Sequence, residues 1–376
     1  MTPKIQKFLS ETACASPCLV VDVDVIERNY DTLKTEMPLA EIFYAVKANP
    51  AAPILERLVG LGSSFDAASV PEILDCLKAG AMPSAISYGN TVKKAGDIKA
   101  AHNLGVTLYA FDSEGELEKL AENAPGSRVY CRILTENSGA EWPLSRKFGC
   151  ELDMAVDLMV RARDLGMEPH GISFHVGSQQ VNPDQWDIAI GRTAMVFSAL
   201  RERGIELKTI NLGGGYPARY REDIPEFSEF ARAIMASMTK HFGNDLPNIM
   251  IEPGRSIAAE AGAILSEVVL VSRKRKDADR RWVYLDIGMF GGLAETMGES
   301  IKYAIKTPHD GGPTGRVAIA GPTCDGADIL YEETPYEMPL ALRSGDRVFI
   351  ESAGAYTTTY SAVNFNGFEP LRELYI

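Results

Sequence analysis

Short apolar runs alternate with longer segments of helical spacing through the first 256 residues of the chain. Segments such as 53–61 and 71–80, and an earlier one at 25–36, repeat apolar residues three and four positions apart, which predicts helices. Eight apolar runs predict strands, and they are IFYAV (42–46), SSF (63–65), AISY (85–88), TLYAF (107–111), RVYCRIL (128–134), GISFHV (171–176), LKTINL (207–212) and NIMIE (248–252). Eight strand–helix units predict a TIM (β/α)8 barrel, with a doubly wound parallel sheet as the alternative that the count of eight disfavours.

The pattern changes from about residue 260, where strand-like runs follow one another with few helical periods between them. These runs are AILSEVVLVS, RWVYLDIGMF, GRVAIAG and DRVFIESAG, and the N-terminal CLVVDVD has the same character. We therefore expect a barrel domain at 23–259 and a sandwich- or barrel-like β-domain made of 1–22 and 260–376. The basic stretch at 272–281 falls between two of the strands and is predicted to be a solvated turn.

Composition and charge narrow the class of protein. The chain has 376 residues and 45% hydrophobic residues, enough to bury the cores of two domains. No apolar run approaches the roughly 18 residues that cross a bilayer, and the N-terminus lacks the pattern of a secretory signal, so we expect a cytoplasmic protein. A net charge of −13 disfavours nucleic acid and anionic membranes as partners. Six scattered cysteines indicate reduced thiols and no metal site.

A polar residue or a glycine cluster follows each predicted barrel strand. In a barrel these positions converge on one mouth, although two of them, Asn90 and Asp112, could instead cap the next helix. Lys47 ends a buried strand that Asn49 and Pro50 stop, which suits an amine that must react better than a surface charge. The remaining strand-end positions are Asp66, Arg132, His175, Gly213, Gly214, Gly215 and Glu252.

Three strand ends carry turns that can hold an anion. GGGYP (213–217), EPGRS (252–256) and HVGSQ (175–179) expose backbone N–H groups, and a glycine lets the backbone approach a phosphate closely. Together with a reactive lysine and a buried carboxylate, they match the needs of pyridoxal phosphate (PLP). The lysine condenses with the aldehyde, the turns hold the phosphate, and the carboxylate keeps the ring nitrogen protonated.

Six motifs in this order, YAVKANP, HVGSQ, GGGYP, EPGR, GPTCDGAD and GAYT, resemble those of the fold type III (alanine-racemase-fold) PLP decarboxylases over essentially the whole chain. Within that group the chain is similar to ornithine decarboxylases and bacterial lysine/ornithine decarboxylases. The resemblance implies that Lys47 carries PLP, that His175 stacks on its ring and that Glu252 binds the ring nitrogen. Asp66 and Arg132 would lie near the cofactor. The phosphate would be held by Ser178, Gly213, Gly214, Gly215, Gly254, Arg255 and Tyr356.

The same resemblance implies roles for residues of the β-domain. Cys324 would return a proton to Cα after carbon dioxide leaves, and Asp286 and Asp325 would bind the distal amine of the substrate beside Tyr356. The family forms a homodimer with shared active sites, in which Cys324 and Asp325 reach the other subunit's site. Lys147 would pair with Asp328 of the partner subunit.

The residues also bear on the reaction. Racemases of this fold place an arginine at the ring nitrogen, so Glu252 favours decarboxylation. Diaminopimelate decarboxylases usually have Cys-Glu-Ser where this chain has Cys324-Asp325-Gly326. Arginine-specific relatives are usually longer than this chain. Antizyme inhibitors, which are non-catalytic relatives, lose cofactor-binding or catalytic residues that are present here. We predict an L-ornithine decarboxylase that makes putrescine, with L-lysine and its product cadaverine as the second pair. Ornithine and lysine differ by one methylene, and a binding pocket discriminates a difference of that size by only about 1–3 kcal/mol. The alternative substrate is diaminopimelate or another basic amino acid.

Overall fold

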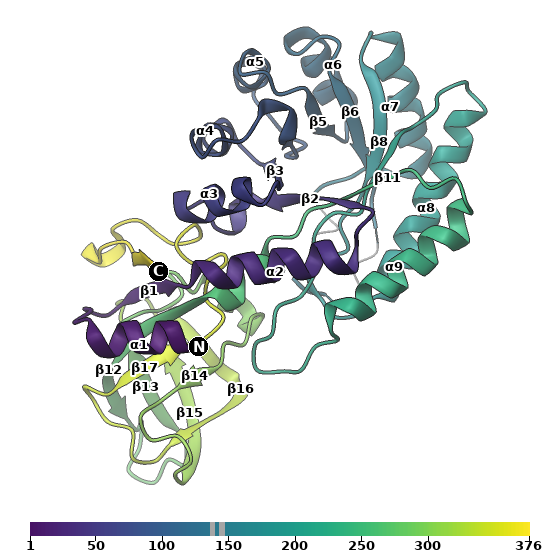
Figure 1. Ribbon diagram of the computed structural model, residues 1–376. Helices are drawn as coiled ribbons and strands as arrows, with labels where there is room; N and C mark the ends of the chain where they lie inside the picture. The colour runs from purple at the N-terminus through teal and green to yellow at the C-terminus, as the bar shows by residue number, and fades with distance from the viewer. Residues whose placement is uncertain (136–139, 143–146) are drawn as a thin grey trace. The chain divides into compact units, whose positions relative to one another are not determined.

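The computed structural model describes residues 1–135, 140–142 and 147–376 (Figure 1). The chain packs into two compact units. The first, called the β-unit below, comprises Met1–Ile26, Ala218–Asp223 and Arg255–Ile376, and the second, called the barrel unit, comprises Glu27–Pro217 and Ile224–Gly254. The domain division at residues 23 and 260 stays a prediction.

Eight parallel strands close into a barrel, which confirms the predicted TIM-type fold. Neighbours along the chain pair in sequence, and β11 returns to β2 with Ile249 opposite Ala40. The strands are β2 (Ala40–Ala45), β3 (Ser64–Ala67), β4 (Ile86–Tyr88), β5 (Leu108–Phe111), β6 (Arg128–Arg132), β8 (Glu168–Ser173), β10 (Thr209–Asn211) and β11 (Asn248–Ile251). Each predicted run overlaps one of them, because strands buried on both faces read as continuous apolar segments.

Helices follow the strands and lie outside them, as Figure 1 shows. They are α2 (Val23–Glu36), α3 (Ala52–Gly60), α4 (Val70–Lys78), α5 (Ala95–Asn103), α6 (Glu114–Asn123), α7 (Leu152–Asp164), α8 (Asp184–Arg201) and α9 (Phe227–Phe242). Helix α4 begins with a reciprocal cap, because the Ser69 side chain accepts from the Glu72 amide and the Glu72 carboxylate accepts from the Ala68 amide. In the described part of the chain, no helix is long and apolar enough to span a bilayer.

Side chains fill the interior of the barrel, so it is a packed core and not a channel. Five buried residues form one cluster there, namely Phe43, Leu108, Ala110, Tyr130 and Met250. The buried hydroxyls of Ser87 and Tyr130 share a hydrogen bond of 2.8 Å across this core. The filled interior leaves the carboxyl ends of the strands as the place for a site.

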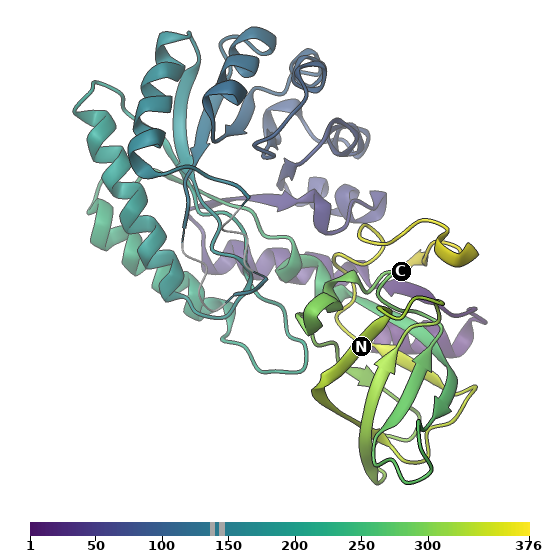
Figure 2. The ribbon, with the colours of Figure 1, turned by 180° about the vertical axis from the view of Figure 1, so that it is seen from behind.

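The β-unit is built on one eight-stranded sheet, whose green and yellow strands Figure 2 shows from behind. Six strands follow the order β14-β17-β12-β13-β15-β16, β1 pairs with β12, and β18 pairs with β1. Strand β1 (Cys18–Val21) runs antiparallel to β12 and parallel to β18, which confirms that the N-terminal segment completes the C-terminal β-domain. The other strands are β12 (Gly262–Ser272), β13 (Arg281–Leu285), β14 (Ile305–Lys306), β15 (Thr314–Ala320), β16 (Ile329–Pro339), β17 (Arg347–Ile350) and β18 (Arg372–Tyr375).

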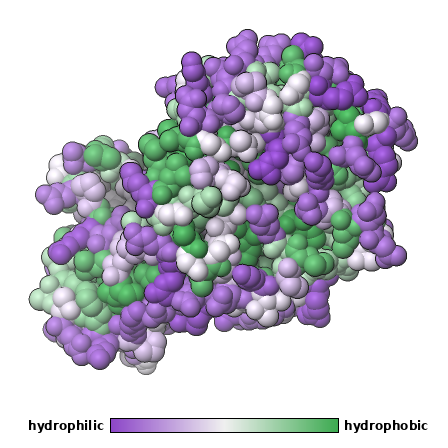
Figure 3. All heavy atoms as spheres, turned by 45° about the horizontal axis from the view of Figure 1, so that its top comes forward, coloured by the Kyte–Doolittle hydropathy of each residue, from purple (hydrophilic) through white to green (hydrophobic). Residues whose placement is uncertain are grey.

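Two short elements were not anticipated. Helix α1 (Pro3–Glu11) precedes β1, and a two-stranded antiparallel pair joins β7 (Ala140–Trp142) to β9 (Ser178–Gln180). The basic stretch does connect β12 to β13, but its last arginine is not solvated. Arg281 is buried and donates hydrogen bonds to the carbonyls of Met338 and Pro339. Hydrophilic residues cover much of the face shown in Figure 3, as expected for a chain with 24% charged residues.

Candidate active site

Lys47 and Asp66 meet at the carboxyl ends of β2 and β3. Lys47 lies in a single 3-10 turn, Val46–Ala48, directly after β2. Its Nζ is 3.8 Å from Oδ2 of Asp66, and its side chain is 47% exposed where that of Asp66 is 4% exposed. The lysine therefore reaches out from the end of a buried strand while a buried carboxylate faces its amine.

Asp66 sits in a tightly enclosed position. A Cβ added to Gly89, after β4, would lie 1.9 Å from Oδ1 of Asp66, so only glycine fits beside this carboxylate. Burial, reinforced by the negative charge of Glu252, raises the pKa of Asp66 well above its ordinary value, and Lys47 opposes the shift. Among the described residues, Oδ1 of Asp66 has no hydrogen-bond partner. A positively charged hydrogen-bond donor bound beside Asp66 would stabilise its ionised carboxylate and give Oδ1 a hydrogen-bond partner.

Glu252, after β11, is fixed by Asn211, a residue that the sequence analysis missed. Asn211 donates from Nδ2 to Oε1 of Glu252 at 2.5 Å, and its Oδ1 accepts from the Gly213 amide at 2.9 Å. The Glu252 amide in turn donates to the carbonyl of Gly213 at 2.9 Å. Asn211 is 1% exposed. The available signal was a polar residue inside the apolar strand that leads into the glycine run.

His175, after β8, is held as a neutral ring. Burial lowers the pKa of His175 well below its usual value, and the positive charges of Arg132 and Lys47 lower it further. The Gly177 amide donates to Nδ1 at 3.0 Å, which places the proton of a neutral imidazole on Nε2. The His175 carbonyl accepts from the Thr135 hydroxyl at 2.8 Å. A flat, uncharged ring in a fixed orientation suits stacking on another aromatic ring.

The glycine run after β10 forms a cradle without side chains. Gly213 and Gly215 have φ values of 65° and 100°, a region that favours glycine. An added Cβ would lie 2.1 Å from the Phe174 carbonyl oxygen at Gly213 and 2.3 Å from the Gly177 carbonyl oxygen at Gly215. The Gly215 carbonyl also accepts from the Gln180 amide at 2.9 Å, beside Ser178 in β9. The two expected phosphate turns, 175–179 and 213–217, thus lie against each other.

Arg132, Asp112 and Asn90 stand at other strand ends of the barrel. The Arg132 guanidinium carbon lies 5.2 Å from the ring centre of Phe148, and Nζ of the exposed Lys147 lies 4.9 Å from the same ring. Asp112 is not the N-cap of α6, a position that Ser113 holds, and its Oδ2 accepts from the Gly149 amide at 2.8 Å. Asn90 likewise accepts from the Val92 amide at 3.1 Å and holds its own loop.

Arg255, in the β-unit, is a buried and fully oriented cation. Its Nη1 donates to the Tyr220 hydroxyl at 2.6 Å and to Oε2 of Glu295 at 2.7 Å, and its Nη2 donates to Oε1 of Glu295 at 2.5 Å. Its guanidinium carbon lies 4.9 Å from the ring centre of Tyr356. Tyr356 has a φ of 55°, which is uncommon for a residue with a side chain. Sequence reasoning missed Tyr220 and Glu295, since neither belongs to a recognisable motif.

The loop between β15 and β16 presents Cys324 and Asp325. Cys324 is exposed, whereas the other five cysteines are buried. Its amide donates to Oδ1 of Asn366 at 2.8 Å, and Asp325 accepts from the Ala327 amide at 2.9 Å. This loop therefore leaves the thiol and the neighbouring carboxylate at the surface of the β-unit.

Asp328 holds the same loop from inside. It is 2% exposed, and its carboxylate accepts from the Met289 amide at 2.7 Å and from the Thr323 amide and hydroxyl at 3.1 and 2.7 Å. Gly288 and Gly321 flank it so closely that an added Cβ would lie 2.1 and 2.3 Å from its oxygens. The pairing of Lys147 with Asp328 of the partner subunit stays a prediction.

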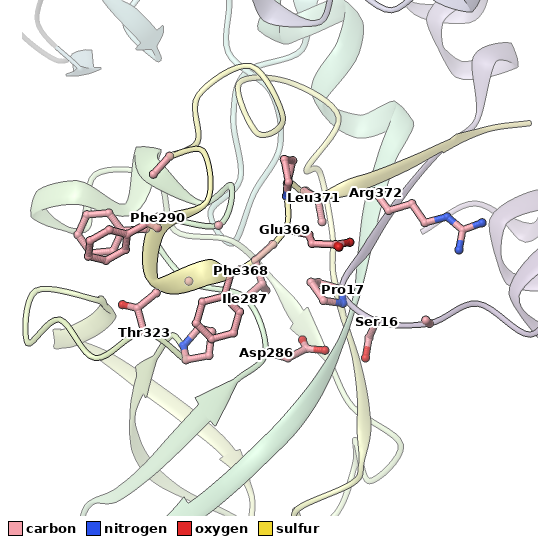
Figure 4. A pocket seen from close by; sticks show the side chains of 17 residues that line it. Ser16, Pro17, Asp286, Ile287, Phe290, Thr323, Phe368, Glu369, Leu371 and Arg372 are labelled. Atoms are coloured by element: carbon pink, nitrogen blue, oxygen red, sulfur yellow. The ribbon is translucent and has the colours of Figure 1, made fainter.

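Asp286, after β13, lies on the wall of a cavity of about 300 Å³ in the β-unit. Its Oδ1 accepts from the Ser266 hydroxyl at 2.6 Å and from the Glu267 amide at 2.9 Å. Figure 4 shows Asp286 and Glu369 on one side of the cavity and Phe290 on the other, with Phe368 between them and the Arg372 side chain extending away. Apolar walls with carboxylates at one side suit a short chain that ends in a cation.

These residues fit PLP. Lys47 offers an amine beside a buried carboxylate, Glu252 offers a second carboxylate in fixed orientation, and His175 offers a neutral ring face. The turn at 213–215 offers a backbone without side chains, which is suited to a phosphate. Within the described ranges, no cluster of three or more His, Cys, Asp or Glu side chains could hold a metal ion.

Comparisons with known proteins agree on one family. Residues 23–259 match the family model described as pyridoxal-dependent decarboxylase, pyridoxal binding domain. A lysine/ornithine decarboxylase of Selenomonas ruminantium is 34% identical over 355 residues, which cover 94% of this chain and 88% of that protein. The structure of SrLDC in complex with PLP and cadaverine aligns with a TM-score of 0.88 and 31% identity, covering 100% of this chain and 94% of that one.

A further solved structure corrects one argument made from the sequence. The arginine decarboxylase of Paramecium bursaria Chlorella virus aligns with a TM-score of 0.90 and 27% identity, covering 100% of both chains. An arginine-specific relative thus has the length of this chain. Length therefore does not separate arginine from ornithine as the substrate, and the distinction must come from the pocket.

Proposed function

Because this chain belongs to the family of pyridoxal-dependent decarboxylases, we propose that it converts L-ornithine to putrescine and, as a second reaction, L-lysine to cadaverine. The chain is a PLP-dependent decarboxylase that acts on basic amino acids. The choice of ornithine and lysine among basic amino acids is the part that we propose.

Lys47 would hold PLP covalently, and the bound ring would supply an electron sink for the electron pair left on Cα when carbon dioxide departs. Glu252 would keep a proton at the ring nitrogen, and the 2.5 Å hydrogen bond from Asn211 would hold its carboxylate in place. Asp66 would place negative charge beside the Lys47 amine, 3.8 Å away. His175 would stack on the ring and, being neutral, would add no charge that competes for electrons.

The remaining roles are proposed for further residues of both units. The phosphate would bind the backbone of Gly213, Gly214, Gly215 and Gly254 together with Ser178, Arg255 and Tyr356. Cys324 would deliver the proton to Cα, for which its exposed position in the β15–β16 loop is suitable. Each of these roles rests on the family motif at the same position.

One observation carries the proposed substrate, namely the Asp286 carboxylate on the wall of a cavity of about 300 Å³ that Phe290, Phe365 and Phe368 also line. A carboxylate in a partly desolvated pocket attracts an ammonium far more strongly than the same carboxylate in water. Phenylalanine side chains would pack along the methylenes of the substrate. Asp325 would supply the second carboxylate for the distal amine.

We also propose a homodimer with shared active sites. The exposed thiol of Cys324 and the neighbouring Asp325 would enter the other subunit's site, and the exposed Lys147 would approach Asp328 of the partner subunit. The surface positions of Lys147, Cys324 and Asp325 support this arrangement, whereas Asp328 is 2% exposed.

The test is a comparison of kcat/KM for L-ornithine, L-lysine, L-arginine and meso-diaminopimelate on the purified holoenzyme. We expect ornithine to be the best substrate and lysine to follow within about 10–200-fold, the range that one methylene provides. A preference for arginine or diaminopimelate would overturn the proposed substrate while leaving the family assignment in place.

A further inference from the structure

Glu295 forms a deeply buried ion pair with Arg255, the arginine that the family motif places at the phosphate. The side chains of Arg255 and Glu295 are 3% and 8% exposed. Two parallel hydrogen bonds of 2.7 and 2.5 Å join the carboxylate to Nη1 and Nη2, the geometry in which both planar groups fix each other's orientation. No motif or comparison gives Glu295 a role.

A dedicated loop holds Glu295 in that position. The connection from β13 to β14 contains the short 3-10 segment Ala294–Glu299, which is kinked at Met297 and Gly298. Glu299 anchors its far end, because the Glu299 carboxylate accepts from the amides of Glu332, Glu333 and Thr334 at 2.6, 2.8 and 2.5 Å. The near side is closed by the Ile301 amide, which donates to the Glu295 carbonyl at 3.0 Å.

Tyr220 completes the setting from a third segment of the β-unit. Its hydroxyl accepts from Nη1 of Arg255 at 2.6 Å, and its ring packs edge-on against Tyr303 with 5.4 Å between ring centres. Tyr303 is itself buried, so the hydroxyl cannot move away without disturbing the core. Arg255 is therefore oriented from two directions by groups that are fixed independently.

Stability alone is a weak explanation for this arrangement. Taking two charges out of water costs about as much as their attraction returns, and buried ion pairs can often be replaced by apolar residues of similar volume without loss. A long arginine side chain, in contrast, must be held in one orientation if it is to meet a phosphate with charge-assisted hydrogen bonds.

We propose that Glu295 is a positioning residue, which, with Tyr220, holds the Arg255 guanidinium in the orientation that receives the phosphate of PLP. The proposal rests on the proposed role of Arg255 in phosphate binding. It predicts that Glu295 matters for a cofactor that carries a phosphate and not for the same ring without one.

The experiment compares PLP with pyridoxal, which has the same aldehyde and ring but no phosphate. Dissociation constants for both are measured by equilibrium dialysis with apoprotein of the wild type and of Glu295→Gln, which keeps one acceptor oxygen and nearly the same shape. We expect PLP to bind about tenfold more weakly to the variant, a loss of about 1.4 kcal/mol, and pyridoxal to bind within about twofold of the wild type. A purely structural role would weaken both ligands alike.

Glu332→Gln is the matched control, because Glu332 also pairs with an arginine of the β-unit, Arg280, at 2.6 Å. It should leave both dissociation constants unchanged. Equal weakening of the two ligands by Glu295→Gln, an unchanged affinity for PLP, or tighter binding of PLP would each overturn the proposal. If Glu295→Gln is unfolded by its melting temperature, Tyr220→Phe replaces it, and a loss of about threefold for PLP alone is then required.

The proposed function and this inference fail in different ways. Wild-type protein that binds PLP but leaves ornithine and lysine intact would remove the proposed substrates and spare the role of Glu295. Wild-type protein that binds PLP no better than pyridoxal would overturn the role of Arg255, and with it that of Glu295.

Discussion

Asn211 donates a hydrogen bond over 2.5 Å to the carboxylate of Glu252, and with its other amide atom it accepts the backbone N–H of Gly213 over 2.9 Å. One buried side chain thus joins the group expected at the ring nitrogen to the turn expected at the phosphate. If PLP binds as proposed, this residue would fix the distance between the groups at the two ends of the cofactor.

Replacing Asn211 by alanine should weaken both functions together. A hydrogen bond to a charged group contributes about 1.5–3 kcal/mol, so kcat/KM for ornithine should fall by roughly 10–100-fold. The measurement is steady-state kinetics at saturating PLP together with the dissociation constant of PLP. Asn248→Ala, at the exposed start of β11, is the control and should behave as the wild type. Normal activity in Asn211→Ala would contradict the role given to this residue.

Gly89→Ala should displace Asp66. The new methyl group would lie 1.9 Å from Oδ1, a distance that no real contact allows, so the carboxylate must move away from Lys47. We expect a loss of at least about tenfold in PLP affinity and a lower melting temperature, as for an overpacked core. Gly60→Ala in helix α3 meets nothing within 4 Å and should be neutral or slightly stabilising. Equal behaviour of the two variants would refute the crowding argument.

Asp286→Asn should separate charge from structure at the proposed substrate pocket. The asparagine oxygen can still accept from the Ser266 hydroxyl and the Glu267 amide, so the fold should be kept. Loss of the negative charge should raise KM for ornithine by about tenfold or more and change kcat less. Asp279→Asn, in the turn between β12 and β13, is the control. An unchanged KM would place the distal amine elsewhere.

His175 should make the stability of the apoprotein depend on pH. Its pKa lies well below the value of about 6.5 that the unfolded chain has, so the unfolded state binds the extra proton between the two values. The contribution of His175 is therefore complete above pH 6.5 and is lost as the pH falls below it, by at most about 1.4 kcal/mol per pH unit. Urea unfolding between pH 5 and 8 should show a smaller acid loss in His175→Asn than in the wild type. Identical slopes would contradict this.

Mixing two inactive variants tests the shared active site. Lys47→Ala should lack the covalent cofactor, and Cys324→Ala should lack the proton donor. If each site combines Lys47 from one subunit with Cys324 from the other, a mixed dimer has one site with both residues intact. About a quarter of the wild-type activity is then expected from statistical exchange of equal amounts. Absence of recovery, with subunit exchange verified by mass-tagged chains, would exclude a composite site.

The sequence predicted the barrel well because its strands are buried on both faces and appear as uninterrupted apolar runs. It also indicated which residues stand at the ends of those strands. Lys47, His175 and Glu252 do follow β2, β8 and β11, and Asp66 lies within β3, next to its final residue Ala67. The ends of the apolar runs predict these positions, since the carboxyl ends of the parallel strands of a barrel lie on one face.

Residues that support others were harder to predict. Gly89 matters only because its backbone passes against Asp66, and Glu295 only because its loop folds back to Arg255 across the β-unit. Neither contact can be predicted from the spacing of residues along the chain. Arg281 was predicted to be solvated because it ends a basic run, but it is buried against backbone carbonyls whose positions the sequence pattern does not indicate.

The pairing of β1 with β12 and β18 has a consequence for how the protein is made. A ribosome releases Cys18–Val21 long before Gly262–Ser272 exists, and the entire barrel emerges in between. The barrel can therefore fold during synthesis, before the strands that pair with β1 have been made. Until then the apolar segment of β1 is unpaired, and it is the segment that a chaperone would most usefully shield.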